Sequence, residues 1–412
     1  MMQLLEAFIG QGWQVMFASP AKVGDNKADL AAMGIDECAI ELNSASFDAF
    51  VAHLQPDIVL FDRFMMEEQF AWRVEKHCPN ALRVIETVDI QSLRDARQIR
   101  LKEHLRSDQA DDAPGPLFDA TLDDLFDQMS EADITQRELA AIYRSDVSLV
   151  ISTFEMDLLI QRFGVPPALL HWCPLMLDDT RPQAPDFAER RHFLSIGNFR
   201  HAPNWDAVLW MKNHLWPQIR RRLPQAQLHI YGAYMPPKAS ALHNPAQGFL
   251  MRGWASDALE VMGQSRVALA PLRFGAGIKG KLVDAMLCGT PSVTTPIGAE
   301  GMHGDNSWPG AISHTVEELV TSAVDLYSNE TSWQAAHTKA ANLLEQHYSF
   351  DVHAKSLIDC LQRLMQTRAR HRKDNFIGAM LRHHQHKSTQ YFSQWIETKN
   401  RLSIEVDGAK NS

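Results

Sequence analysis

Residues 271–301 read PLRFGAGIKGKLVDAMLCGTPSVTTPIGAEG, and this stretch predicts how the chain folds. An apolar strand, VALAP, ends at Pro271, and a short loop rich in small residues follows. A helix is then expected from about residue 278 to residue 289. Strand–loop–helix units of this kind build α/β domains with parallel sheets. Small residues before a helix also let backbone N–H groups approach an anion, which the helix dipole favours.

Charged side chains accompany this loop and helix. Arg273, Lys279 and Lys281 place cations beside the helix start, and Asp284 offers a carboxylate further along the helix. Phosphates at the helix start and a ribose along its side would suit a nucleoside diphosphate. The competing interpretation is an ordinary strand–loop–helix with solvated lysines, which a glycine-rich loop alone would not exclude. The order of loop, cations, helix and carboxylate favours the nucleotide site.

Short apolar runs alternate with helical stretches on both sides of this unit, as in α/β proteins with parallel sheets. Strands are expected in the first half at 13–19, 36–41, 57–61, 82–86, 147–151 and 168–172. In the second half they are expected at 192–196, 226–231, 248–251, 266–269 and 291–294, with a helix over 203–222 after the first of them. The polar stretch 178–191 contains two prolines and is interpreted as the linker between two domains.

Three segments depart from the alternation. The chain opens on a helix, MMQLLEAFIGQG, where such a domain usually opens with a strand, so the first strand of the N-terminal domain is expected to be missing. Either the start lies too far downstream or the sheet has lost a strand, and we favour the first explanation. Residues 102–138 are acidic and predict an excursion of loops and helix. The tail, 366–405, is basic and carries four aromatic side chains.

Composition limits the function. The 412 residues suggest two domains, and the net charge of −10 argues against nucleic acid as a partner. Five widely spaced cysteines without a CxxC pair argue against a disulfide framework or a zinc cluster. No apolar run reaches the length of a membrane span, and no signal peptide is evident. We therefore expect a cytoplasmic protein that could touch the inner face of a membrane.

The stretch 271–301 resembles the donor-site signature of retaining glycosyltransferases of family four. GNFRHAPNWDAVLW (197–210), LHIYG (228–232) and FLMRGW (249–254) resemble further blocks of that family in the expected order. The resemblance implies a GT-B fold, with two Rossmann-like domains facing a cleft and a C-terminal helical extension. It implies an acceptor domain over 1–180, a donor domain over 190–350, and C-terminal helices with the basic tail over 351–412.

The resemblance also implies roles for particular residues. The family's helix carries two glutamates eight positions apart; the second falls on Asp284, a partner for the ribose, and the first falls on Ala276. The family's phosphate-binding arginine and lysine after the first strand of this domain are displaced. The predicted donor-binding residues are Arg200, Arg273, Gly275, Ala276, Gly277, Lys279, Lys281 and Asp284. The resemblance implies catalysis without a metal, and no cofactor is expected because the sugar nucleotide is a substrate.

In the first half, VIETVDIQSLRDAR (84–97) resembles the loop where the family places polar groups toward the acceptor. Asp89 is the candidate for orienting or deprotonating the acceptor hydroxyl, with Glu86 and Arg94 nearby. The alternative is that Asp89 caps a helix starting near Ser92.

These observations predict a retaining hexosyltransferase that uses a nucleoside-diphosphate sugar in polysaccharide or glycan assembly. The acceptor would be a glycan, a lipid-linked sugar or a small molecule. The alternative is a non-catalytic GT-B protein that binds a nucleotide or a partner. For the tail, packing across the domains or dimerisation is favoured over peripheral membrane contact.

Overall fold

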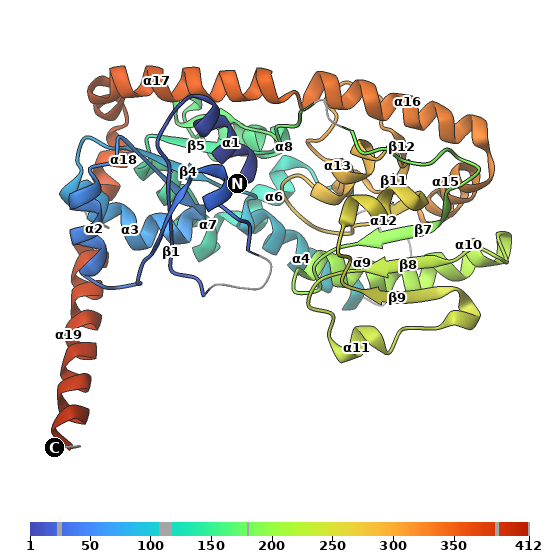
Figure 1. The fold of residues 1–412 in the computed structure, drawn as a ribbon, viewed down its shortest axis with the longest axis horizontal. Coiled ribbons are helices and arrows are strands. Elements are labelled where there is room, and N and C mark those ends of the chain that lie inside the picture. Colours follow the sequence, from blue (N-terminus) through green and yellow to red (C-terminus); the bar gives the residue numbers. More distant parts are fainter. Residues whose placement is uncertain (23–26, 107–117, 179–180, 384–386, 411–412) are drawn as a thin grey trace.

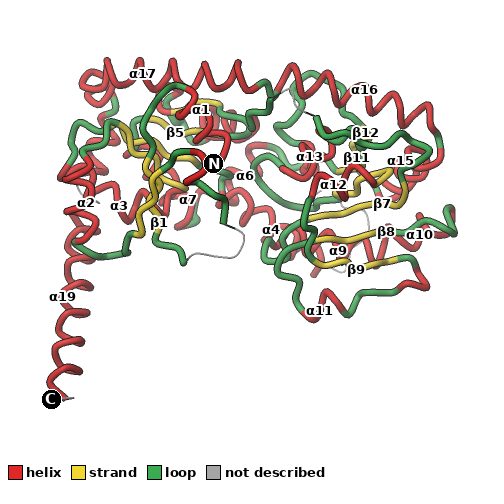
Figure 2. The backbone as a smooth tube through the Cα atoms, in the orientation of Figure 1, coloured by secondary structure: helices red, strands yellow, loops and turns green. Residues whose placement is uncertain are grey.

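The computed structural model describes residues 1–22, 27–106, 118–178, 181–383 and 387–410, without the side chains of 400, 401 and 403–410. Two α/β domains lie side by side, and helices α16 (Glu330–His347) and α17 (Phe350–Asp374) run along one side of both (Figure 1). Figure 2 shows strands inside each domain with helices around them. The α/β class predicted from the alternating pattern is confirmed.

The C-terminal domain is built on a six-stranded sheet with the order β12-β11-β10-β7-β8-β9. Every neighbouring pair in this sheet is parallel. Its strands are β7 (Arg191–Ile196), β8 (Leu228–Tyr231), β9 (Phe249–Gly253), β10 (Ser265–Ala270), β11 (Ser292–Thr294) and β12 (Gly310–Ile312). All but β12 lie where the sequence predicts a strand. Because the strands are parallel, their carboxyl ends share one edge of the sheet.

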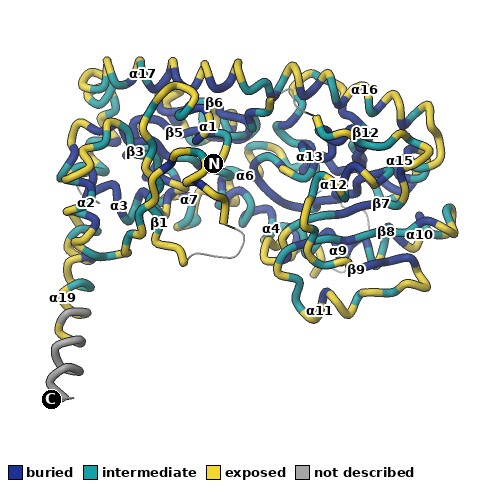
Figure 3. The backbone as a smooth tube through the Cα atoms, in the orientation of Figure 1, coloured by how far each residue is buried: buried dark blue, intermediate teal, exposed yellow. Residues whose placement is uncertain are grey.

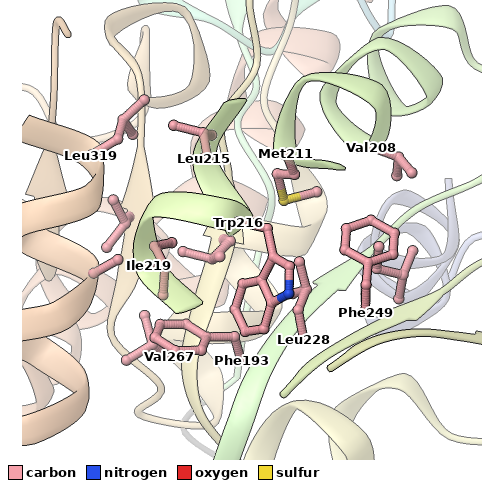
Figure 4. Close-up of a cluster of buried hydrophobic side chains, with 14 of the residues drawn as sticks. Phe193, Val208, Met211, Leu215, Trp216, Ile219, Leu228, Phe249, Val267 and Leu319 are labelled. Carbon is pink, nitrogen blue, oxygen red and sulfur yellow. The ribbon is translucent and has the colours of Figure 1, made fainter. Parts of the chain in front are cut away.

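Helices cover this sheet on both faces: α9 (Ala202–Trp210), α10 (Trp216–Arg222), α11 (Pro237–Ser240), α12 (Ala258–Gln264), α13 (Gly280–Leu287), α14 (Pro296–Ala299) and α15 (Val316–Ser328), besides α16. The helix expected over 203–222 is interrupted by a π-helical segment at Met211–Leu215. Figure 4 shows Trp216 in the core beside Phe193 and Leu228. Its indole N–H donates to the carbonyl of Gln247 at 2.7 Å, so the buried donor is satisfied.

The N-terminal domain contains two separate sheets. Strands β1 (Met16–Ser19) and β2 (Asp36–Ala39) form a parallel pair, while β3 (Ile58–Asp62), β4 (Leu82–Glu86), β5 (Val147–Val150) and β6 (Leu170–Trp172) form a four-stranded parallel sheet. The opening helix α1 (Met2–Gly10) is confirmed and packs on both sheets. Its Leu4 contacts the cluster around Leu82, and its Leu5 contacts the cluster around Ile35. In the described residues, β1 and β3 each stand at an edge of a separate sheet.

The helices of this domain are α2 (Ser46–Leu54), α3 (Arg63–His77), α4 (Gln91–Arg106), α6 (Leu122–Ser130), α7 (Asp133–Arg144) and α8 (Thr153–Asp157). The acidic excursion predicted over 102–138 is largely helical, with 107–117 outside the described residues. Helix α6 begins with a capping box, in which Thr121 and Asp124 exchange side-chain and backbone hydrogen bonds. This local signal explains why an acidic segment forms a helix there.

The C-terminal helices return to the N-terminal domain. Leu357 and Leu361 of α17 pack with Val84 and Leu149 of the four-stranded sheet. Helices α18 (Phe376–Leu381) and α19 (Lys387–Lys410) follow, and α19 ends away from the body (Figure 1). The predicted helical extension is confirmed, but α17 completes the core of the N-terminal domain. In the described part of the chain, no helix has both the length and the apolar character to cross a bilayer.

Candidate functional site

The candidate site lies at the carboxyl edge of the C-terminal sheet. Strands β7 and β10 are parallel neighbours, so the loops that follow them, residues 197–201 and 271–279, meet at that edge. Helix α13 begins at Gly280, two residues later than expected, because Lys279 is in an extended conformation at its N-cap. Ligands of open α/β sheets bind in this position.

Lys281 of α13 reaches the loop after β7. Its ammonium donates to Asn204 Oδ1 at 2.6 Å, and a Cβ at Gly197 would lie only 2.7 Å from the same nitrogen. Burial lowers the pKa of Lys281 to about 8, partly offset by Asp284. Burial raises the pKa of Asp284 to about 6, partly offset by Lys281. At neutral pH the site therefore presents an ammonium and a carboxylate three residues apart on one helix face.

The two predicted arginines have partners within the protein. Arg273 forms a bidentate ion pair with Asp206, with N···O distances of 2.6 and 2.9 Å. The guanidinium of Arg200 lies 3.7 Å from the ring centroid of Tyr234. Their contact with a diphosphate stays a prediction, whereas Lys281 of α13 reaches the loop after β7 from the neighbouring segment.

The loop of Gly275, Ala276 and Gly277 is held by its surroundings. Arg97 of α4 donates to the carbonyl of Gly275 at 2.9 Å, and Lys279 donates to the carbonyl of Gly277 at 2.7 Å. Lys279 is buried, and burial lowers its pKa to about 8, partly offset by Glu300. The structure thus gives Lys279 a backbone partner inside the protein, whereas the sequence suggested a phosphate.

Contacts with the N-terminal domain fix the same loop from the other side. Ala276 packs in a cluster with Ile90 and Leu93, which follow β4. Arg97 forms a bidentate ion pair with Glu300 of the C-terminal domain, with N···O distances of 2.6 and 2.8 Å. The predicted donor loop and the predicted acceptor loop therefore contact each other directly.

Asp89 lies in the loop after β4, where it pairs with Arg94. A Cβ added to Gly277 would come within 2.8 Å of the Asp89 Cβ, so the aspartate is adjacent to the donor loop. The N–H groups of Gln91 and Ser92, at the start of α4, donate to Glu138 at 2.7 and 2.9 Å. Glu138 therefore supplies the cap that was considered for Asp89.

Three functional candidates escaped sequence reasoning. His201 follows β7, and burial lowers its pKa, with the charges of Arg94 and Asp89 also acting on it. Asn204 receives the hydrogen bond from Lys281. Glu155 of α8 accepts a hydrogen bond from the N–H of Gly277 at 2.8 Å. The sequence motifs could not indicate these residues, because each depends on an interaction between segments far apart in sequence.

Residues 190–329 match the family model described as "Glycosyl transferases group 1". Over this segment the chain is similar to group 1 glycosyltransferases. The matched segment includes the whole six-stranded sheet, the loops after β7 and β10, and α13. No curated protein sequence matches the chain.

Solved structures with similar folds are GT-B glycosyltransferases. One is HepE of Anabaena in complex with UDP and glucose, with a TM-score of 0.64, 11% identity, and coverage of 88% of this chain and 95% of that one. Another is sucrose-phosphate synthase of Thermosynechococcus elongatus, with a TM-score of 0.61, 14% identity, and coverage of 89% of this chain and 92% of that one. A third is a mutant of TarM from S. aureus in complex with fondaparinux, alpha-GlcNAc-glycerol and UDP. Its TM-score is 0.56 at 12% identity, with coverage of 76% of this chain and 58% of that one, so the chain spans little more than half of TarM. The likeness extends over both domains, and the chain has the GT-B fold.

Proposed function

We propose that the protein transfers a sugar from a nucleoside-diphosphate sugar to a hydroxyl acceptor. The observation that carries the proposal is the presence of Lys281 and Asp284 one turn apart on α13, with Lys281 reaching the loop after β7, in the segment that matches the group 1 glycosyltransferase model. In this proposal Lys281 stabilises the charge that develops on the leaving diphosphate. The carboxylate of Asp284 accepts hydrogen bonds from ribose hydroxyls.

The acceptor would lie on the side of the N-terminal domain, at the loop that carries Asp89. Asp89 orients or deprotonates the acceptor hydroxyl, and its pairing with Arg94 keeps the carboxylate in place. His201 lies among the charges of both loops and is a further candidate contact for the diphosphate. We also propose Arg200, Arg273 and the loop 275–277 as parts of the donor site, reached when the arginines exchange their present partners.

The finer features of the proposed reaction come from the resemblance to family four. They are retention of anomeric configuration, transfer of a hexose, independence of metal and cofactor, and a role in polysaccharide or glycan assembly on the cytoplasmic side. UDP is the nucleotide in the HepE and TarM structures, which makes uridine the first base to test. The competing proposal is a non-catalytic GT-B protein, supported by Ala276 in place of a carboxylate.

The proposal is tested by incubating the protein with a panel of sugar nucleotides and simple glycoside acceptors. Release of nucleoside diphosphate in step with formation of a new glycoside is expected for one donor. Proton NMR of the product should show the anomeric configuration of the donor. Tight nucleotide binding without turnover on any acceptor would favour the non-catalytic protein, and an inverted product would overturn retention.

We further propose that the outer face of α19 contacts an anionic membrane surface. Ser393 and Glu397 on one face bind Arg73 and the N–H of Ala45. Tyr391, Phe392 and Trp395 are 58% to 66% exposed, and Lys399 lies 5.4 Å from the Trp395 ring centroid (Figure 3 colours the described part of α19 mostly exposed or intermediate). Aromatic rings beside cations suit the interface of an anionic bilayer.

The membrane contact is tested by sedimentation with vesicles, with and without anionic lipid. Replacing Tyr391, Phe392 and Trp395 by serine should abolish binding to anionic vesicles. Trp254→Ser is the matched control, because this tryptophan of the C-terminal domain is also 59% exposed. Unchanged vesicle binding by the triple variant would overturn the proposal, and a loss of self-association in light scattering would favour dimerisation instead.

A further inference from the structure

Glu155 joins the two loops of the proposed site through one oxygen atom. It lies in the first turn of α8, and its side chain is fully buried. Its Oε1 accepts a hydrogen bond from the N–H of Ile90 at 2.9 Å and another from the N–H of Gly277 at 2.8 Å. Ile90 directly follows Asp89, and Gly277 belongs to the C-terminal domain. One carboxylate oxygen therefore holds the acceptor loop and the donor loop together.

Hydrogen bonds fix the backbone of Gly277 and of nearby Gly275 on several sides. Its N–H is bound by Glu155 and its carbonyl by Lys279, while Arg97 binds the carbonyl of Gly275. Gly277 adopts a φ of +62°, which other residues rarely adopt, and a Cβ there would meet Asp89 at 2.8 Å. The conformation of the donor loop is thus dictated largely by side chains outside it.

The second oxygen of Glu155 is also buried, and it has no hydrogen-bond partner within the described part of the chain. Burial raises the pKa of this carboxyl to about 7. A buried carboxyl group with an unpaired oxygen destabilises the folded protein. Unlike an ordinary helix cap, Glu155 also accepts a hydrogen bond from the opposite domain, from the N–H of Gly277.

We propose that Glu155 is a positioning residue that sets the donor loop against the acceptor loop and thereby determines the affinity for the sugar nucleotide. This inference rests on the proposed function of the same site. Glu155 acts through the backbone of Gly277, so its loss should weaken donor binding although it lies in the N-terminal domain. The backbone N–H groups of a loop must be correctly oriented before a phosphate can use them.

Glu138 provides a matched control within the same domain. It too is buried, its pKa is raised to about 7 by burial, and it accepts hydrogen bonds from two consecutive N–H groups, those of Gln91 and Ser92. These N–H groups open α4, directly after Ile90. Glu138 differs from Glu155 in that its hydrogen bonds stay within the N-terminal domain, so comparing the two alanine variants isolates the contact with Gly277.

The experiment measures amide hydrogen exchange over residues 274–278 in the full chain, without any nucleotide. Glu155→Ala should accelerate exchange in this segment at least tenfold, while Glu138→Ala should leave it unchanged. Glu155→Gln should resemble the wild type, because its amide oxygen can accept both hydrogen bonds. If the alanine variant does not fold, Glu155→Asp gives the same test, since its shorter side chain cannot span both N–H groups.

The kinetic arm uses the sugar nucleotide that the wild type accepts. Glu155→Ala should raise the donor KM at least tenfold, whereas Glu138→Ala should leave the donor KM within twofold of the wild type. Unchanged exchange over 274–278 in Glu155→Ala, or an equal change in both alanine variants, would overturn the inference. Because exchange needs no ligand, its result is independent of whether the proposed sugar transfer is correct.

Discussion

Replacing Lys281 by methionine should separate stability from catalysis. Burial lowers the pKa of Lys281 from its usual 10.5 to about 8, which corresponds to about 3 kcal/mol of unfavourable charge burial. The side chain keeps some exposure to solvent, so we discount this to about 1–2 kcal/mol. The variant also loses the 2.6 Å hydrogen bond to Asn204, a loss of about 1–2 kcal/mol for a charged donor.

The two effects on stability oppose each other and nearly cancel. We therefore expect the free energy of unfolding of Lys281→Met to change by no more than about 1 kcal/mol, a shift of about 2–4 °C in Tm for a domain of this size. Catalysis has no such compensation, because the cation facing the diphosphate is gone. A loss of about 10²-fold to 10³-fold in kcat/KM is expected for removal of one such contact.

The assay pairs thermal unfolding with release of nucleoside diphosphate. Lys355→Met is the control, because this lysine of α17 is exposed and pairs with Asp359 away from the site. The control should change neither quantity. A kcat/KM of Lys281→Met within threefold of the wild type would refute the role of the lysine. A large fall in Tm matching the fall in activity would refute the separation of the two effects.

Three further changes have definite expected outcomes. Affinity for a sugar nucleotide should fall below about pH 6, where Asp284 becomes protonated, and above about pH 8, where Lys281 loses its proton. In titration calorimetry, Lys281→Arg should keep its affinity to higher pH than the wild type. An affinity that does not change with pH would contradict this prediction. Gly277→Ala should lower Tm and kcat because of its φ of +62° and its contact with the acceptor loop, whereas Gly280→Ala, with no atom within 4 Å of the new Cβ, should be tolerated. Arg372→Ala should lower the free energy of unfolding by about 3 kcal/mol in urea denaturation, since it breaks two 2.7 Å bonds to a buried carboxylate, and a change below about 1 kcal/mol would place this pair with exposed ones.

The strands of the C-terminal domain could be predicted because their sequences carry the signal themselves. The strand Ser265–Ala270 is buried along most of its length and contains the apolar run VALA, and Gly289 follows the end of α13 with a φ of +58°. The strand β12 was missed because Gly310–Ile312 is three residues long and only partly buried. The π-helical segment within the predicted helix 203–222 has no comparable local signal.

The N-terminal domain was harder to predict because its sheet pairing is not local. The sequence indicated the strands 36–41 and 57–61, but not that β2 and β3 would belong to different sheets. The packing of the basic tail could not be predicted either, because Arg372 pairs with the buried carboxylate of Asp146, which is far away in the sequence. This part of the tail packs on the N-terminal domain, whereas the option considered was packing across the two domains.

Some residues of the candidate site could be predicted from the sequence and others could not. Residues on one helix, such as Lys281 and Asp284, could be grouped from their spacing alone. The sequence could not show that Lys279 turns inward to Gly277, or that Glu155 reaches the same glycine from the other domain. The contact of Glu155 depends on how the two domains meet, which a single sequence does not encode in any short pattern.

The central claim is that α13 and the loop after β7 bind a nucleoside diphosphate, and thermal unfolding in the presence of nucleoside diphosphates and sugar nucleotides tests it most directly. Ligand at about 100 times its Kd should stabilise the protein by about 2.7 kcal/mol. We predict that nucleotides of one base raise Tm by several degrees, and that Asp284→Ala abolishes the shift while keeping the unliganded Tm. No shift with any nucleotide, or an equal shift in Asp284→Ala, would contradict the account.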